Sequence, residues 1–173
     1  MIDLVPLATI ASNRIEDLLD RAFGPDRHAR TAYRIRSGTT AIPQLSFAAV
    51  SQDGKLLGTI QCWPVVLDCD KGAEVPMVMV GPVAIDPDLQ RGGLGRTLMR
   101  HMLEHAANSG LPGADALMLI GDPEYYERFF GFTAQLTGRW RLPGPYEQRR
   151  LLALGNAVPD CAGLIGPRLS QSA

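Results

Sequence analysis

The segment Gln90–Gly95 constrains this chain most, because its three glycines follow a long apolar stretch and precede a helical pattern. It reads Gln-Arg-Gly-Gly-Leu-Gly, a Q-x-x-G-x-G pattern just after the apolar run Val75–Ile85. Glycine lets the backbone turn its N–H groups inward without a Cβ clash. The helix expected from about Leu94 adds unpaired N–H groups and the positive end of its dipole. The segment therefore predicts a strand, a phosphate-binding loop and a helix, in that order.

Two common nucleotide-binding loops match this segment badly. The P-loop places a lysine directly after its last glycine, and the two lysines of the chain, Lys55 and Lys71, lie elsewhere. The dinucleotide fingerprint requires a glycine at position 98, where the chain has Leu98. A glycine-rich turn that only caps a helix stays open as an alternative at this point.

The composition is that of an ordinary globular chain. The 173 residues suit one domain over 1–173, with 46% hydrophobic and 20% charged residues and a net charge of −1. The N-terminus has no signal-peptide pattern and no apolar run is long enough to cross a bilayer, so we expect a cytoplasmic protein without a membrane partner. Cys62, Cys69 and Cys161 are odd in number and form no C-x-x-C pair, so we expect reduced thiols.

Apolar periodicity and turn residues predict one mixed α/β (α+β) domain. A capping box formed by Ser12 or Asn13 with Glu16 is expected to start the first helix, and Asp26 to cap a second that runs to about Arg36. Asp122-Pro123 is a typical helix start. Gly81-Pro82 interrupts a strand and favours a bulge. The predicted strands are Ile2–Leu7, Leu45–Ser51, Lys55–Val66, Val75–Ile85, Ala116–Ile120 and, as the last, Leu151–Leu154, with further helices from about Leu94 to Gly110 and over Glu124–Phe130.

The order of these motifs resembles the GNAT superfamily of N-acetyltransferases. Val83–Pro87 leads into Gln90–Gly95, and Asp122–Phe132 follows with a tyrosine-bearing helix and Gly-Phe. Ala22–Pro25 and Arg141–Pro145 are similar to a bacterial subgroup of predicted N-acetyltransferases. The resemblance implies a mixed, mostly antiparallel central sheet, splayed between the fourth and fifth strands and flanked by about four helices.

The resemblance also implies acetyl-CoA as co-substrate, with no metal. Its pyrophosphate would lie on the backbone amides of Arg91 through Arg96, and its pantetheine arm beside Val83–Ile85. The Val83 N–H would face the thioester carbonyl and stabilise the oxyanion. The implied cofactor-binding residues are Val83, Ala84, Ile85, Gln90, Arg91, Gly92, Gly93, Leu94, Gly95, Arg96 and Thr97.

The reaction implied by the resemblance is direct attack of a primary amine on the thioester in a ternary complex. The leaving thiolate requires a proton, and the neutral phenol of Tyr126 suits that task, with Tyr125 as the second choice. Relatives often place the tyrosine four residues before Gly-Phe, where this chain has Glu127. Some relatives carry a glutamate on the strand before the bulge, where this chain has Met79, so no general base is assigned.

Three other interpretations of the sequence remain. His101 and His105 match the H-x-x-E-H pattern of zinc peptidases, and the chain could also be a CoA-binding sensor without catalysis. The arginines over 21–36 could attract an anionic partner, although we expect no nucleic-acid binding. The acceptor is a small-molecule or peptide amine, and the arginines over 139–150 hint at an anionic one. Dimerisation is common in such folds, and the sequence does not fix it.

Overall fold

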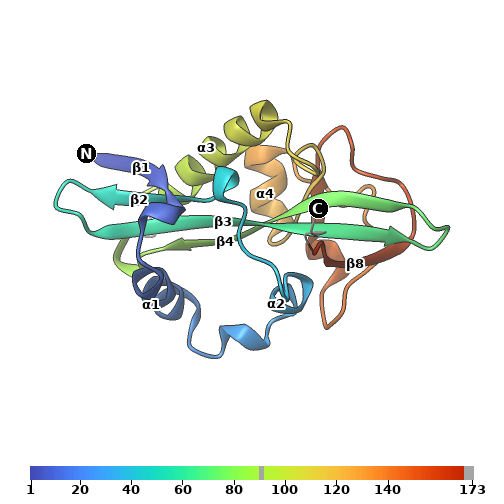
Figure 1. Ribbon diagram of the computed structural model, residues 1–173, viewed down its shortest axis with the longest axis horizontal. Helices are drawn as coiled ribbons and strands as arrows, with labels where there is room; N and C mark the ends of the chain where they lie inside the picture. Colours follow the sequence, from blue (N-terminus) through green and yellow to red (C-terminus); the bar gives the residue numbers. More distant parts are fainter. Residues whose placement is uncertain (90–91, 170–173) are drawn as a thin grey trace. The chain divides into compact units, whose positions relative to one another are not determined.

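The computed structural model (Figure 1) describes residues 1–89 and 92–169. The chain divides into two compact units. Unit 1 comprises Met1–Ala29, Ala41–Cys62 and Gly81–Ser109. Unit 2 comprises Arg30–Thr40, Trp63–Val80 and the chain from Gly110 onward. Two long strands, β3 (Leu56–Cys69) and β4 (Glu74–Ile85), each contribute to both units. One domain over 1–173 stays a prediction.

Unit 1 is a sheet with a helix on each face. Strand β1 (Ile2–Pro6) pairs antiparallel with β2 (Phe47–Ser51), which pairs antiparallel with the start of β3. Helices α1 (Ser12–Phe23) and α3 (Leu94–Ser109) lie on opposite sides of these strands (Figure 1). The core under α1 consists of small and branched apolar side chains, namely Leu7, Ile15, Leu18, Leu19, Ala48, Leu56 and Ala84.

The predicted N-cap of α1 is wrong. Ala11 occupies the cap position without a side-chain hydrogen bond, because the helix already includes Ser12 and the predicted cap Asn13. The predicted capping-box partner Glu16 instead binds the guanidinium of Arg27, which is 3% exposed and also donates to Asp20 at 2.9 Å. The Glu16 carboxylate therefore fastens the segment after α1 rather than its start.

Unit 2 contains α2 (Thr31–Ile35), β5 (Leu117–Ile120), α4 (Pro123–Phe130), β6 (Trp140–Arg141), β7 (Leu151–Leu154) and β8 (Gly163–Pro167). β5 pairs antiparallel with β7, and β8 pairs antiparallel with β3 and parallel with β6. The prediction that β7 is the last strand is therefore wrong, because β8 follows it. The predicted helix over 26–36 is also divided, into the 3-10 turn Arg27–Ala29 and α2. Further 3-10 turns cover Leu7–Thr9, Pro43–Leu45, Pro87–Leu89 and Gln148–Arg150.

The predicted fold class is confirmed. Within the described residues the sheet has eight strands, hydrogen-bonded in the order β1-β2-β3-β4-β5-β7 with β8 beside β3. β4 pairs parallel with β5 only at Val78–Leu117 and Met79–Met118, although β5 continues to Ile120. The fourth and fifth strands therefore separate beyond these two residue pairs, in agreement with the predicted splay. None of the helices in the described part combines the length and apolar character needed to cross a bilayer.

The expectation of three reduced thiols is wrong for one pair. Cys69, at the end of β3, forms a disulfide with Cys161, whose Cα lies 6.1 Å away across a sequence separation of 92 residues. Spacing along the chain gives no sign of this contact, because the return of the chain to β3 as β8 creates it. Cys62 is a buried free thiol whose pKa is raised by burial.

We predict that Cys161→Ser lowers the free energy of unfolding by about 2–4 kcal/mol, because a crosslink that closes a long loop restricts the unfolded chain. Urea unfolding with and without a reductant measures the loss. Cys62→Ala is the matched control and should stay sensitive to the reductant. Equal unfolding midpoints of the wild type in both conditions, with a mass equal to the fully reduced chain, would show that the bond does not form.

Candidate acyl-CoA site

The glycine loop follows β4 and leads into α3, as the sequence predicts, and the end of β4 from Gly81, the loop and α3 belong to unit 1. After Ile85, the 3-10 turn Pro87–Leu89 is closed by a hydrogen bond from the Leu89 N–H to the Asp86 carbonyl, at 2.8 Å. Two of the predicted cofactor-binding residues, Gln90 and Arg91, lie outside the described residues. The described parts of the loop are therefore Asp86 to Leu89, before these two residues, and the chain from Gly92 onward, after them.

In the described part of the loop, one backbone amide is hydrogen-bonded within the loop, and the following amides lie in the first turn of the helix. The Gly92 N–H donates to the Leu89 carbonyl at 3.1 Å, so this predicted amide is engaged within the loop. Gly93 has a φ of 74°, a conformation that favours glycine, and its carbonyl accepts from the Thr97 N–H and hydroxyl. The first-turn amides at Leu94 and Gly95 precede the first intrahelical bond. They are the better anion donors.

The Asp86 carboxylate fixes the start of this loop. It is 1% exposed, and its Oδ1 accepts from the Asp88 N–H at 3.0 Å. Its Oδ2 lies 3.4 Å from Arg21 Nη1 and 3.7 Å from Lys55 Nζ. The Asp88 N–H and then the two cations lower the pKa of this carboxyl below its usual range. A charged group thus holds the turn that precedes the glycines.

The end of β4 carries the residues predicted to face the pantetheine arm. Gly81 has a φ of 123° and its peptide bond to Pro82 is cis, so the strand departs from regular geometry before Val83. Ala84 is fully buried in the core under α1, whereas Val83 and Ile85 are partly exposed. Val83 and Ile85 therefore remain accessible at the position where the resemblance places the arm.

The predicted general acid lies on α4 in unit 2. Asp122 caps this helix, as predicted, by accepting from the Glu124 N–H. The ring of Tyr126 packs over Gly121, where an added Cβ would stand 2.5 Å from Tyr126 Cε2. Burial, followed by the proximity of Tyr125, raises the pKa of Tyr126 to about 12. Tyr126 is thus a neutral proton donor at every physiological pH.

The two tyrosines have different surroundings. The Tyr125 ring lies 4.9 Å from the Tyr126 ring and 5.2 Å from that of Phe129. Tyr126 instead lies against the backbone at the end of β5 and toward Phe132, at a ring distance of 6.3 Å. Both rings therefore belong to the aromatic cluster of α4, since Tyr126 also lies 6.2 Å from the Phe130 ring, and Tyr126 packs in addition against the end of β5.

Three of the four arginines that hinted at an anionic acceptor, Arg139, Arg141 and Arg149, have carboxylate partners within unit 2. Arg141 binds Asp70 through two hydrogen bonds, at 2.7 and 3.0 Å. Arg139 binds Asp160 at 2.9 Å, and Arg149 binds Glu124. Because these charges are compensated within the chain, they do not by themselves favour an anionic acceptor.

The histidines of the H-x-x-E-H pattern pack against each other rather than around a common point. The rings of His101 and His105 lie 4.4 Å apart, and both contact the Phe47 ring. Burial and then the proximity of His105 lower the pKa of His101. Over residues 1–89 and 92–169, no group of three or more His, Cys, Asp or Glu side chains is placed to hold a metal ion.

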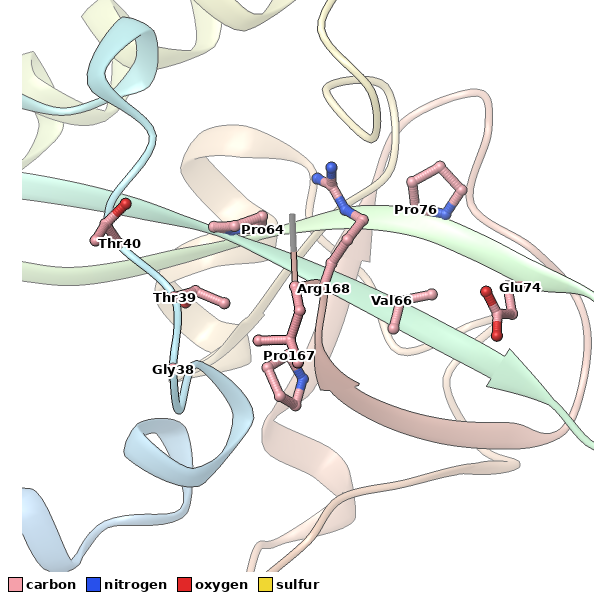
Figure 2. Close-up of a pocket in the computed structure, with 10 residues that line it drawn as sticks. Gly38, Thr39, Thr40, Pro64, Val66, Glu74, Pro76, Pro167 and Arg168 are labelled. Atoms are coloured by element: carbon pink, nitrogen blue, oxygen red, sulfur yellow. The ribbon is translucent and has the colours of Figure 1, made fainter. Parts of the chain in front are cut away.

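A cavity of about 670 Å³ lies in unit 2 beside β3, β4 and β8 (Figure 2). Thr39 and Thr40 lie on one side of it and Glu74 and Pro76 on the other, and none of the predicted site residues lines it. Arg168 at its wall donates to the carbonyls of three segments, Val65 at 3.0 Å and Met77 and Pro112 at 3.1 Å. This guanidinium holds backbone segments together.

Two residues of the site had no predicted role. Asp86 stands directly before Pro87, a pairing typical of a capped turn, and this signal could have identified it as the anchor of the loop. Gly121 precedes the Asp122-Pro123 helix start, but only the structure reveals its contact with the Tyr126 ring.

We predict that Asp86→Asn lowers the free energy of unfolding at pH 7 by about 1.5–3 kcal/mol, the usual contribution of hydrogen bonds to a charged group. Because the folded-state pKa of Asp86 is depressed, its contribution is present above the unfolded value of about 4 and is lost as the pH falls through the folded value. Urea unfolding of both proteins at pH 7 and at pH 3 tests this. A difference that grows toward acid pH would contradict it.

The comparisons with known proteins agree with this arrangement. The acetyltransferase (GNAT) family model matches residues 12–132. The chain is 29% identical over 132 residues to the uncharacterized N-acetyltransferase YjhQ of Escherichia coli K12, which covers 76% of this chain and 69% of that protein.

Two crystal structures share the fold. The GNAT family N-acetyltransferase YhbS of Escherichia coli, in complex with CoA, has a TM-score of 0.70 and 23% identity over 97% of this chain and 89% of that one. A GNAT family acetyltransferase of Brucella melitensis, in complex with acetyl-CoA, has a TM-score of 0.65 and 24% identity over 97% and 96%. The predicted enzyme class, an N-acetyltransferase, is confirmed at the level of the family, and the chain belongs to the GNAT family of acetyltransferases.

Proposed function

We propose that this chain transfers an acetyl group from acetyl-CoA to a primary amine by direct attack in a ternary complex, within a single domain. The observation that carries the proposal is the anchored loop between β4 and α3, which Asp86 holds at its start and which ends at the first turn of α3. Relatives of the same fold have CoA or acetyl-CoA in their crystal structures. The pyrophosphate would bind the first-turn amides at Leu94 and Gly95, together with Gly93, Arg96 and Thr97.

The reaction needs one bond formed, one broken and two proton transfers. The amine nitrogen forms a bond to the thioester carbon, and the Val83 N–H stabilises the charge that develops on the oxygen. The carbon–sulfur bond then breaks, and the thiolate takes a proton from the Tyr126 hydroxyl. The proton that the amine nitrogen releases passes to solvent, from which the tyrosine is reprotonated. Met79 provides no base, because a thioether does not accept a proton at physiological pH, and its side chain is 3% exposed within the core of unit 2.

We predict that Tyr126→Phe lowers kcat by about 10²–10⁴-fold, the usual contribution of a positioned proton donor, with little change in the Kd of acetyl-CoA. The pKa of Tyr126 is about 12. The wild-type rate should therefore show no decline from tyrosine ionisation up to about pH 11. Release of the CoA thiol, followed with a thiol reagent from pH 6 to pH 10.5 (about the limit of thioester stability), measures both effects.

Tyr125→Phe is the matched control, because it removes the same atom from the neighbouring ring and should leave kcat within about threefold. Gly121→Ala places a methyl group against the Tyr126 ring and should lower kcat although the hydroxyl remains. A larger loss for Tyr125→Phe than for Tyr126→Phe would assign the proton donor to Tyr125.

The proposal as a whole is tested by calorimetry with CoA and by acetyl-CoA turnover with polyamines, amino acids, aminoglycosides and a lysine peptide. We expect CoA binding by the wild type and its loss in Gly93→Glu, where a side chain and a negative charge enter the loop at a φ of 74°. CoA binding without turnover of any amine would instead indicate a CoA-binding sensor. No heat of CoA binding would exclude the proposed function.

A further inference from the structure

Two buried oxygens on β3 have no hydrogen-bond partner within residues 1–89 and 92–169, namely Thr59 Oγ1 and Gln61 Oε1. Thr59 is 0% exposed and Gln61 is 8% exposed. Buried polar atoms of folded proteins are nearly always hydrogen-bonded, so each exception calls for an explanation. Side chains two residues apart on a strand share one face. The two oxygens therefore form a polar pair on one face of the sheet in unit 1.

Pairing with β2 identifies this face. Thr59 lies opposite Ala48, and Ala48 belongs to the core under α1 together with Ala84 of β4. Both alanines are fully buried and small. Thr59 and Gln61 are thus on the α1 side of the sheet.

Pairing with the end of β4 places the polar pair beside the predicted reaction centre. The Asp86 N–H donates to the Leu57 carbonyl at 2.9 Å, and Gly58 faces the Ile85 side chain. Steps of two residues from this antiparallel pair place Thr59 opposite Ala84 and Gln61 opposite Pro82. Gln61 therefore lies at the irregular Gly81–Pro82 position, one residue from Val83.

We propose that Gln61 holds the N–H groups of the acceptor amine and that the Thr59 hydroxyl, which has no partner among the described residues, binds the Gln61 amide once the amine is present. The inference rests on the proposed function, which needs a bound amine beside Val83. Gln61 is buried, with 8% of its surface exposed, and a turn about the last bond of its side chain exchanges its amide oxygen and nitrogen.

The chemistry of a carboxamide suits this task better than that of a carboxylate. An amine attacks only as the neutral base, and a neighbouring carboxylate would stabilise its ammonium form and raise its pKa. An amide oxygen accepts an N–H hydrogen bond without carrying a charge, so the nitrogen keeps its lone pair at lower pH. This agrees with the absence of a carboxylate at Met79.

The test is Gln61→Met, which keeps the length of the side chain and removes its polar end. We expect kcat/KM for the best amine of the panel to fall about tenfold or more. The Kd of acetyl-CoA and the hydrolysis of acetyl-CoA without amine should not change. The melting temperature should stay equal or rise, because an apolar group of similar shape replaces a buried unbonded oxygen. Thr59→Val should show the same pattern with a smaller loss of kcat/KM. Thr59→Ser keeps the hydroxyl and should therefore keep the wild-type kcat/KM.

The matched control is Thr137→Val in unit 2. Thr137 is also fully buried, but its hydroxyl donates to the Leu151 carbonyl at 2.7 Å, so this variant should melt at a lower temperature with unchanged kinetics. The inference is overturned if Gln61→Met melts lower, like Thr137→Val, and keeps its kcat/KM for the amine within twofold. Failure of the wild type to acetylate any amine would overturn the proposed function instead, a result that the wild-type assay alone identifies.

Discussion

The hydrogen bonds of Asp86 fix the place at which β4 ends and the glycine loop begins. Its backbone N–H continues the pairing with Leu57 of β3, while its carboxylate turns the chain by accepting from the Asp88 N–H. Arg21 of α1 and Lys55 stabilise the charge of this buried group. One residue thereby connects a strand, a helix and the loop. The start of α3, and with it the direction of its first amides, depends on this anchor.

Local signals predicted the elements whose ends are set by neighbouring residues. Asp122-Pro123 fixes the start of α4 by a cap that needs no tertiary contact, and Leu151–Leu154 is found as a strand with the predicted bounds. Prediction from the sequence failed for elements and contacts that depend on residues far away in the chain. Glu16 suits a capping box, but a buried Arg27 binds its carboxylate. β6 and β8 are short, and β8 pairs with both β6 and β3, which no local pattern reveals.

The candidate site likewise has features that the sequence predicts and features that only the structure reveals. The glycine loop and the tyrosine helix follow from residue types at fixed spacing, and the GNAT family match covers both. The pattern could not show that the Gly92 amide is used inside the loop, or that Gly121 accommodates the Tyr126 ring. Thr59 and Gln61 stand in an apolar run that reads only as a strand. Their unusual feature is the lack of a hydrogen-bond partner among the described residues, which only the structure reveals.

The disulfide between Cys69 and Cys161 closes a covalent ring that contains β4, the glycine loop, α3, β5, α4, β6 and β7. A protease that cuts one peptide bond inside this ring leaves both pieces joined through sulfur. Such a nicked molecule keeps its mass apart from one added water, and it separates into two fragments only after reduction. Cleavage at a loop inside this ring is therefore visible only on reducing gels.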